Sequence, residues 1–125
     1  MTTIYLIRHG QASFGAESYD KLSPNGELQA KLLGQYFNQI LKEEPYVVAG
    51  SMQRHQQTAN LALAECFPDT RIMTDNAWNE FNHQQVFAQY EPRFNEPHLL
   101  KQDVENEANP RAYLAKIFEG AIERW

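Results

Sequence analysis

Short apolar runs alternate with longer amphipathic stretches along the first part of the chain. The runs lie at residues 4–7, 46–49 and 71–74, and their β-branched and aromatic side chains are typical of strands. The first run, Ile-Tyr-Leu-Ile, is continuously apolar, so we expect a strand buried on both faces. Apolar side chains at helical spacing predict helices over residues 24–42 and 53–66. This alternating order predicts a parallel sheet covered by helices, an α/β fold.

Capping and breaking residues mark the ends of the two helices. Ser23 followed by Pro24 is typical of an N-cap and a first helical residue. Pro45 and Pro68 each follow a helical stretch and are expected to end it.

The last third of the chain is patterned differently. Helices are predicted over residues 81–90 and 111–125, with a proline-flanked break at residues 91–97 between them. No strand is evident after residue 74.

Composition restricts the class of protein. The 125 residues fit one domain over residues 1–125, and 42% of them are hydrophobic, enough for a core. The formal net charge of −5 argues against nucleic-acid or anionic-membrane partners. Cys66 is the only cysteine, which excludes an internal disulfide and a cysteine-rich metal site. With no signal segment and no stretch of membrane-spanning length in the sequence, we expect a cytoplasmic protein.

Reactive polar residues follow each predicted strand. Arg8-His9-Gly10 comes directly after the first strand, Arg54 lies in the first turn of the helix after the second, and Glu80 follows the third. Because right-handed crossovers bring the carboxyl ends of parallel strands to one edge of a sheet, we expect these side chains to lie close together. Two guanidinium groups and a helix N-terminus beside a histidine form an anion pocket that suits phosphate.

Such a pocket would contain the groups that phosphoryl transfer needs. His9 is the candidate nucleophile, and Glu80 is the candidate acid for the leaving oxygen. Arg8 and Arg54 would bind the non-bridging oxygens. The arginines neutralise the charge of the phosphoryl group, so no metal and no cofactor is required. The expected partner is a small phosphomonoester or a phosphate ion.

Four sequence blocks, in order, resemble those of the histidine phosphatase superfamily, the phosphoglycerate mutase-like family. They are Arg8-His9-Gly10 for the R-H-G motif, residues 22–30 (LSPNGELQA) for L-S-x-x-G-x-x-Q-A, residues 54–59 (RHQQTA) for R-x-x-Q-T-A, and Glu80 for the acidic residue after the third strand. A tripeptide alone occurs by chance, but four ordered blocks separated by fitting elements are a specific signal. The resemblance covers residues 3–83.

The resemblance implies both a fold and roles for individual residues. The implied fold is a three-layer α/β/α sandwich with a mostly parallel sheet. His9 would form a phosphohistidine, and Glu80 would be the proton donor. Arg8 and Arg54 would bind the phosphoryl group.

The chain departs from the family in two places. Many members have a phosphate-binding asparagine seven positions after the motif arginine, where this chain has Gly15; Gln11 and Ser13 are the candidates to replace that contact. The family also has a second essential histidine in an S-H-G block on a later strand, and no such block occurs here. His83 and His98 lie in polar or proline-flanked segments with no predicted strand before them.

The other histidines do not suggest a metal site. His55, His83 and His98 lack metal-ligand spacing and are interpreted as ordinary polar residues, although His83 is also a candidate to line the pocket near Glu80. Because domains of the family run longer and add further strands, we expect the N-terminal portion of such a domain: a truncated gene product, an expression fragment or a proteolytic fragment. An uncovered sheet edge would then favour homo-oligomers or poor solubility.

These observations leave several functional hypotheses. A phosphomonoester phosphatase that forms a phosphohistidine on His9 is favoured. Phosphoglycerate mutases carry an E-S-x-W-N type segment after R-H-G, whereas residues 11–15 here read Gln-Ala-Ser-Phe-Gly, so mutase transfer fits less well. The missing second histidine supports an alternative from another class, a catalytically weak or inactive phospho-ligand binding module. An inactive fragment of an enzyme is the third hypothesis.

Overall fold

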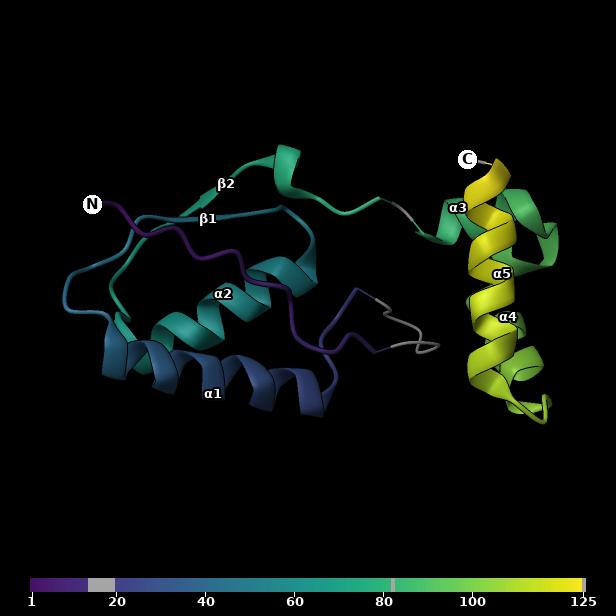
Figure 1. Cartoon of the computed structure of the whole chain (residues 1–125), viewed down its shortest axis with the longest axis horizontal. Helices are drawn as coiled ribbons and strands as arrows, with labels where there is room; N and C mark the ends of the chain where they lie inside the picture. The colour runs from purple at the N-terminus through teal and green to yellow at the C-terminus, as the bar shows by residue number, and fades with distance from the viewer. Residues whose placement is uncertain (14–19, 82, 125) are drawn as a thin grey trace. The chain divides into compact units, whose positions relative to one another are not determined.

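The computed structural model describes residues 1–13, 20–81 and 83–124 (Figure 1). Contacts within the chain divide it into two compact units. The first contains residues 1–13 and 20–80, and the second contains residues 81 and 83–124. Each unit has its own helices and is described by itself.

Two helices form most of the first unit. Helix α1 spans Pro24–Ile40 and α2 spans Gln53–Cys66, so both predicted helices are confirmed. The Ser23 hydroxyl accepts a hydrogen bond from the Gly26 backbone N–H at 3.1 Å and caps α1, as its position before Pro24 predicted. The helices pack on each other through buried apolar residues, which are Ala30 and Phe37 of α1 and Ala62 and Leu63 of α2.

A small parallel sheet completes the first unit. Strands β1 (Val47–Ala49) and β2 (Ile72–Thr74) pair in parallel, with Val48 opposite Met73. Helix α2 lies between the sheet and α1 (Figure 1). The short helix η1 (Asn76–Trp78) follows β2. The predicted α/β class with parallel strands is therefore confirmed, and in the described residues both helices lie on one side of the sheet (Figure 1).

The N-terminal apolar run does not form the predicted buried strand. Among the described residues the sheet consists of β1 and β2, and residues 4–7 join no ladder. Ile4 and Leu6 are each 80% exposed. Tyr5 instead packs edge-on against Phe37 of α1, with ring centroids 5.1 Å apart. The strand prediction was wrong because an apolar run favours burial but does not specify a main-chain partner. Strands β1 and β2 have only three residues each, so they offer few hydrogen bonds to a further strand.

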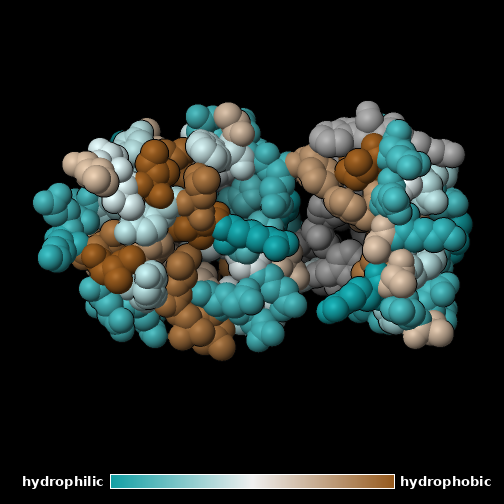
Figure 2. Space-filling view, in the orientation of Figure 1, coloured by the Kyte–Doolittle hydropathy of each residue, from teal (hydrophilic) through white to brown (hydrophobic). Residues whose placement is uncertain are grey.

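Apolar surface is correspondingly exposed on the first unit. Figure 2 shows hydrophobic atoms gathered over much of its visible face. Large exposed apolar side chains of this unit include those of the N-terminal run and three of α1, where Leu28, Leu32 and Tyr36 are each more than half exposed.

The second unit is helical. It contains α3 (His83–Tyr90), the short helix η2 (Pro92–Asn95), α4 (Pro97–Glu105) and α5 (Pro110–Arg124). The predicted first and last helices are confirmed, whereas α4 was missed. Pro97 was interpreted as part of a break, but proline is also favoured at the first position of a helix, which it occupies here. The core consists of buried residues from all four helices, namely Val86, Phe87, Phe94, Leu100, Ile117 and Ala121.

Candidate functional site

His9 and Glu80 meet in the first unit although 71 positions separate them in sequence. His9 Nε2 lies 3.2 Å from Glu80 Oε2. His9 ends the N-terminal segment, and Glu80 follows β2 and η1. The His9 side chain is 13% exposed, whereas that of Glu80 is 45% exposed, so the pair lies at an opening to solvent.

Arg54 is the buried cation of this site. Its side chain is 4% exposed and comes from the first turn of α2. Nε and Nη2 donate to the same oxygen of Glu80, Oε2, at 3.2 and 3.0 Å. Nη1 donates to Asp20 Oδ1 at 2.7 Å. All three guanidinium nitrogens therefore bind carboxylates, and one carboxylate oxygen is shared between Arg54 and His9.

Asp20 caps helix α2 from a distant part of the chain. The N-cap residue, Met52, makes no side-chain capping bond, whereas Asp20 Oδ2 accepts the backbone N–H of Gln53 at 2.8 Å. Burial raises the pKa of the Asp20 carboxyl, but hydrogen bonds from the Gln53 backbone and the Arg54 side chain outweigh it and hold the net pKa below its ordinary value of 3.8. Asp20 thus stays ionised and binds Arg54 through the guanidinium nitrogen that does not contact Glu80.

A buried hydroxyl connects the His9 segment to α2. The backbone N–H of Gly10 donates to Thr58 Oγ1 at 3.1 Å, and the same hydroxyl donates to the Arg54 carbonyl at 2.8 Å. Gly10 also lies directly against Gly26 at the start of α1. A Cβ built on either glycine would collide with backbone of the opposite segment, so this approach requires glycine at both positions.

The neighbours of the His9 ring determine which nitrogen is reactive. Nδ1 lies within hydrogen-bond distance of the Gly10 carbonyl, which can only accept, so we assign a proton to Nδ1. Nε2 then faces Glu80 and carries the lone pair whenever His9 is neutral. This arrangement orients Nε2 into the opening that Arg54 and Glu80 line.

Glu80 is ionised in this arrangement. Burial raises the pKa of its carboxyl, but the hydrogen bond from Arg54 and the charge of His9 outweigh burial, and the net pKa lies below the ordinary value of 4.5. In the empty site Glu80 is therefore an anion bound by the two groups that could otherwise bind a phosphoryl oxygen.

The remaining predicted site residues lie differently. Arg8 is exposed, and among the described residues it has no hydrogen bond or ion pair. Gln11 is bonded to the start of α1. Its side-chain oxygen accepts a hydrogen bond from the Ser23 hydroxyl at 2.9 Å, and its backbone N–H donates to the side-chain oxygen of Gln29 at 2.8 Å. The Ser13 backbone N–H donates to the Lys21 carbonyl at 2.8 Å. The structure thus brings His9, Arg54 and Glu80 together, while Gln11 and Ser13 participate in local structure.

Comparison with known proteins shows the family to which the chain belongs. The family model of the histidine phosphatase superfamily (branch 1) matches residues 4–116 of the chain. The chain belongs to the histidine phosphatase superfamily. No curated protein and no solved structure matched it. The resemblance of its four sequence blocks to this family is therefore confirmed, and the match extends well beyond Glu80.

The site of this histidine phosphatase superfamily member contains residues that sequence reasoning did not select. Asp20 and Asn79 lie in unremarkable contexts, and only their distant partners reveal them. Thr58 belongs to the RHQQTA block, but the sequence assigned no role to it, and its bond to Gly10 reveals one. His55 was interpreted as an ordinary polar residue, yet its ring centroid lies 5.7 Å from that of His9. The sequence position of His55, directly after the motif arginine, could have predicted this. Residues in the first turn of a helix that begins at a site lie close to that site.

The other histidines named in the sequence analysis lie elsewhere. His98 lies in the second unit, exposed, with Nε2 3.4 Å from Glu96 Oε2. The side chain of His83, and Gly15, lie outside the described residues. Within the described part of the chain, no group of three or more histidine, cysteine or acidic side chains could hold a metal ion. The described helices also include none with the length and apolar composition needed to cross a bilayer.

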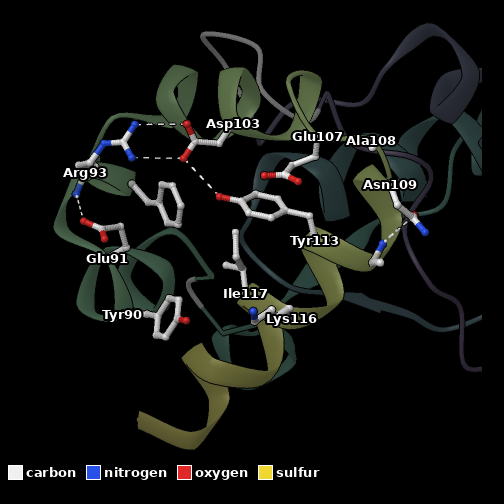
Figure 3. A pocket seen from close by; sticks show the side chains of 12 residues that line it. Tyr90, Glu91, Arg93, Asp103, Glu107, Ala108, Asn109, Tyr113, Lys116 and Ile117 are labelled. Carbon is white, nitrogen blue, oxygen red and sulfur yellow. Dashed lines mark hydrogen bonds and ion pairs between the residues drawn. The ribbon is translucent and has the colours of Figure 1, made fainter.

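The second unit contains a separate open cavity of about 660 Å³ (Figure 3). Arg93 binds Asp103 through both terminal nitrogens, at 3.4 and 3.2 Å, and the Tyr113 hydroxyl donates to Asp103 at 3.3 Å. Burial and the Asp103 charge raise the pKa of Tyr113. The described lining contains no histidine, so this cavity offers no nucleophile comparable to His9.

Proposed function

We propose that the protein is a phosphomonoester phosphatase that transfers the phosphoryl group to His9. This activity is more specific than membership of the histidine phosphatase superfamily, which includes both phosphatases and mutases. Hydrolysis is preferred to mutase transfer because residues 11–15 lack the segment that mutases carry after R-H-G.

One observation carries the proposal: an imidazole nitrogen and two guanidinium nitrogens converge on a single anionic oxygen. His9 Nε2, Arg54 Nε and Arg54 Nη2 lie 3.0–3.2 Å from Glu80 Oε2. A phosphoryl oxygen that replaced this carboxylate oxygen would accept the two Arg54 hydrogen bonds, with the lone pair of His9 Nε2 beside the phosphorus. The arrangement suits binding of a tetrahedral dianion and attack upon it.

The first step transfers the phosphoryl group to the enzyme. The Nε2 lone pair of His9 forms a bond to phosphorus while the bond from phosphorus to the ester oxygen breaks. The electron pair of that bond stays with the leaving oxygen, which takes a proton from the carboxyl of Glu80. Arg54 binds the non-bridging oxygens throughout.

The second step returns the enzyme to its starting state. Water attacks phosphorus and gives a proton to the Glu80 carboxylate, while the electron pair of the phosphorus–nitrogen bond returns to His9 Nε2. The first step requires Glu80 to be protonated when substrate is bound, and the second step restores that proton. A bound dianion would favour the protonated carboxyl, because it takes over the Arg54 hydrogen bonds and adds negative charge beside Glu80, and both changes raise the pKa of Glu80.

Arg8 completes the proposed anion site. Arg8 precedes His9 in the sequence and is exposed. We expect its guanidinium to contact a phosphoryl group on His9. Together Arg8 and Arg54 would neutralise the two charges of a phosphomonoester, so the mechanism assigns no step to a metal ion.

The second candidate function is a phospho-ligand binding module. The observation that favours it is the state of the acid: the pKa of Glu80 is lowered, and Arg54 is bound on all sides by carboxylates. If a bound dianion does not raise the pKa of Glu80 enough for this carboxyl to hold a proton, the site binds phosphate but the leaving oxygen receives no proton.

The decisive experiment compares the wild-type protein with His9→Ala on p-nitrophenyl phosphate, with His98→Ala as the matched control. We expect turnover by wild type and His98→Ala, loss of turnover in His9→Ala, and an acid-labile phosphohistidine trapped only when His9 is present. Phosphate binding without turnover in the wild type would favour the module. Equal turnover by His9→Ala and wild type would contradict the phosphatase proposal.

A further inference from the structure

His55 lies beside His9 and takes no part in the mechanism above. The two rings have centroids 5.7 Å apart and planes inclined at 43°. His55 follows Arg54 in the first turn of α2, so the helix that positions the guanidinium also positions this ring. Its electrostatic neighbours are the site residues themselves, which are Arg54, Glu80, His9 and Asp20.

One edge of the His55 ring is packed against backbone. Its Nδ1 is buried and has no hydrogen-bond partner among the residues that the structure describes. A Cβ built on Gly50 would collide with this nitrogen, and it would lie equally close to Asn79 Oδ1. The Asn79 side chain is itself bonded to Ser51, at 2.7 and 2.9 Å. The missing side chain at Gly50 therefore provides the space that the ring occupies, and the buried edge of the ring is fixed.

The ring is neutral at neutral pH, and its proton can be assigned. Burial lowers the pKa of His55 below 6.5, and the charge of Arg54 lowers it further. A neutral imidazole has one N–H and one lone pair. A buried N–H without an acceptor is rarer in proteins than a buried acceptor without a donor, so we assign the lone pair to Nδ1 and the proton to Nε2.

We propose that His55 is a second phosphate-binding histidine of this site, whose Nε2–H donates to a non-bridging oxygen of the phosphoryl group beside His9. The inference rests on the proposed function, since it adds a contact to the same phosphoryl group. A neutral donor suits this position, because a positively charged ring beside Glu80 would hold that carboxyl ionised, whereas the proposed reaction needs it protonated. His55 would contribute a directed hydrogen bond without that charge.

The affinity for inorganic phosphate tests the contact. Titration calorimetry compares the wild type with His55→Phe, which keeps a ring against Gly50 but no N–H, and with His55→Gln, which keeps an N–H donor. His98→Gln is the control. We expect His55→Phe to weaken phosphate binding about tenfold or more, as for loss of a hydrogen bond to a charged group, and His55→Gln to recover part of that loss. Equal weakening in Phe and Gln variants would indicate lost packing and would overturn the donor role.

A measurement on the wild-type protein keeps the inference testable if His55→Phe fails to fold. Ring nitrogen NMR of ¹⁵N-histidine-labelled protein reports which nitrogen of His55 carries the proton. We expect the Nε2–H tautomer, and we expect its proton resonance to shift when phosphate is added. An Nδ1–H tautomer, or no shift at saturating phosphate, would overturn the proposal.

The two proposals fail in different ways. If the wild type binds phosphate but hydrolyses no ester, the phosphatase proposal is wrong, and the affinity comparison still judges His55. If the wild type hydrolyses ester and His55→Phe binds phosphate as tightly as the wild type, His55 is not a ligand and the phosphatase proposal stands. A wild-type protein that binds no phosphate contradicts both.

Discussion

The hydroxyl of Thr58 accepts a hydrogen bond from the backbone N–H of Gly10 at 3.1 Å, across 48 positions of sequence. The same hydroxyl donates to the Arg54 carbonyl one turn earlier in α2. Thr58 is 6% exposed, so water cannot replace either bond without rearrangement. A single side chain thus fixes the segment that carries the proposed nucleophile to the helix that carries its cation.

Replacing Thr58 by valine is expected to lower both stability and activity. Valine has the shape of threonine but leaves the buried Gly10 N–H without an acceptor, which costs about 1–3 kcal/mol of unfolding free energy. Thr58→Ser is the control, because it keeps the hydroxyl and loses one methyl group, about 1 kcal/mol. Urea denaturation gives the stabilities, and we expect the turnover of p-nitrophenyl phosphate to fall about tenfold or more in the valine variant as His9 loses its position. A valine variant with the stability and turnover of the serine variant would show that the hydroxyl is dispensable.

Replacing Arg54 by methionine is expected to destabilise the protein and abolish phosphate binding. Two carboxylates would lose their shared partner, and the half-exposed Asp20 and Glu80 would have to rehydrate in place. We expect a loss of about 1–3 kcal/mol in unfolding free energy at neutral pH, and a smaller loss in acid, where both carboxyls are protonated. The exposed Arg71 provides the control, since Arg71→Met should change stability by less than about 0.5 kcal/mol. A loss that does not depend on pH would indicate that packing of the Arg54 side chain, rather than its charge, is what the substitution removes.

The sequence predicted the elements of the first unit better than their assembly. Helix α2 begins and ends where apolar spacing and Pro68 placed it, because these signals are local. Residues 4–7 carry an equally clear apolar signal and form no strand, since pairing depends on a partner far along the chain. Pro97 was ambiguous because proline both ends one helix and starts another.

The sequence also predicted only part of the site: three of its side chains, but not the residues that hold them. His9, Arg54 and Glu80 were expected to meet at the carboxyl ends of three parallel strands. They do lie together, although the segment before His9 forms no strand among the described residues. Asp20 could not have been found in this way: it acts as a cap for α2 from a loop, through two oxygens whose partners are backbone and side-chain groups more than thirty positions away. Contacts of this kind depend on the folded path of a loop, which no local pattern encodes.

The pH dependence of stability is expected to show two separate ranges. The folded-state pKa of His55 lies below 6.5, so between 6.5 and that lower value the unfolded chain binds a proton that the folded chain does not, and the unfolding free energy falls as the pH is lowered. The pKa values of Asp20 and Glu80 are also lowered, from 3.8 and 4.5, so the stability that these carboxylates contribute is complete above those values and is lost only in stronger acid.

The His55→Phe variant separates these two ranges. Denaturation of the wild type and the variant at intervals from neutral to acid pH should show the slope below 6.5 in the wild type only. The loss in stronger acid should appear in both proteins, because Asp20 and Glu80 are unchanged. An identical slope in both proteins near neutral pH would mean that His55 is not held neutral by the fold.

Replacing Glu80 by glutamine is expected to change binding and turnover in opposite directions. Glutamine removes the carboxylate that occupies His9 and Arg54 in the empty site, so inorganic phosphate should bind up to about fivefold more tightly, the effect of a half-exposed charge. It also removes the proposed proton donor, so kcat on a phosphomonoester should fall by about 100-fold or more. Glu119→Gln, an exposed position on α5, is the control for loss of one negative charge. If phosphate binding weakens together with turnover, Glu80 is part of the structure that binds the anion; if binding strengthens while turnover is lost, it competes with phosphate in the empty site and supplies the proton during the reaction.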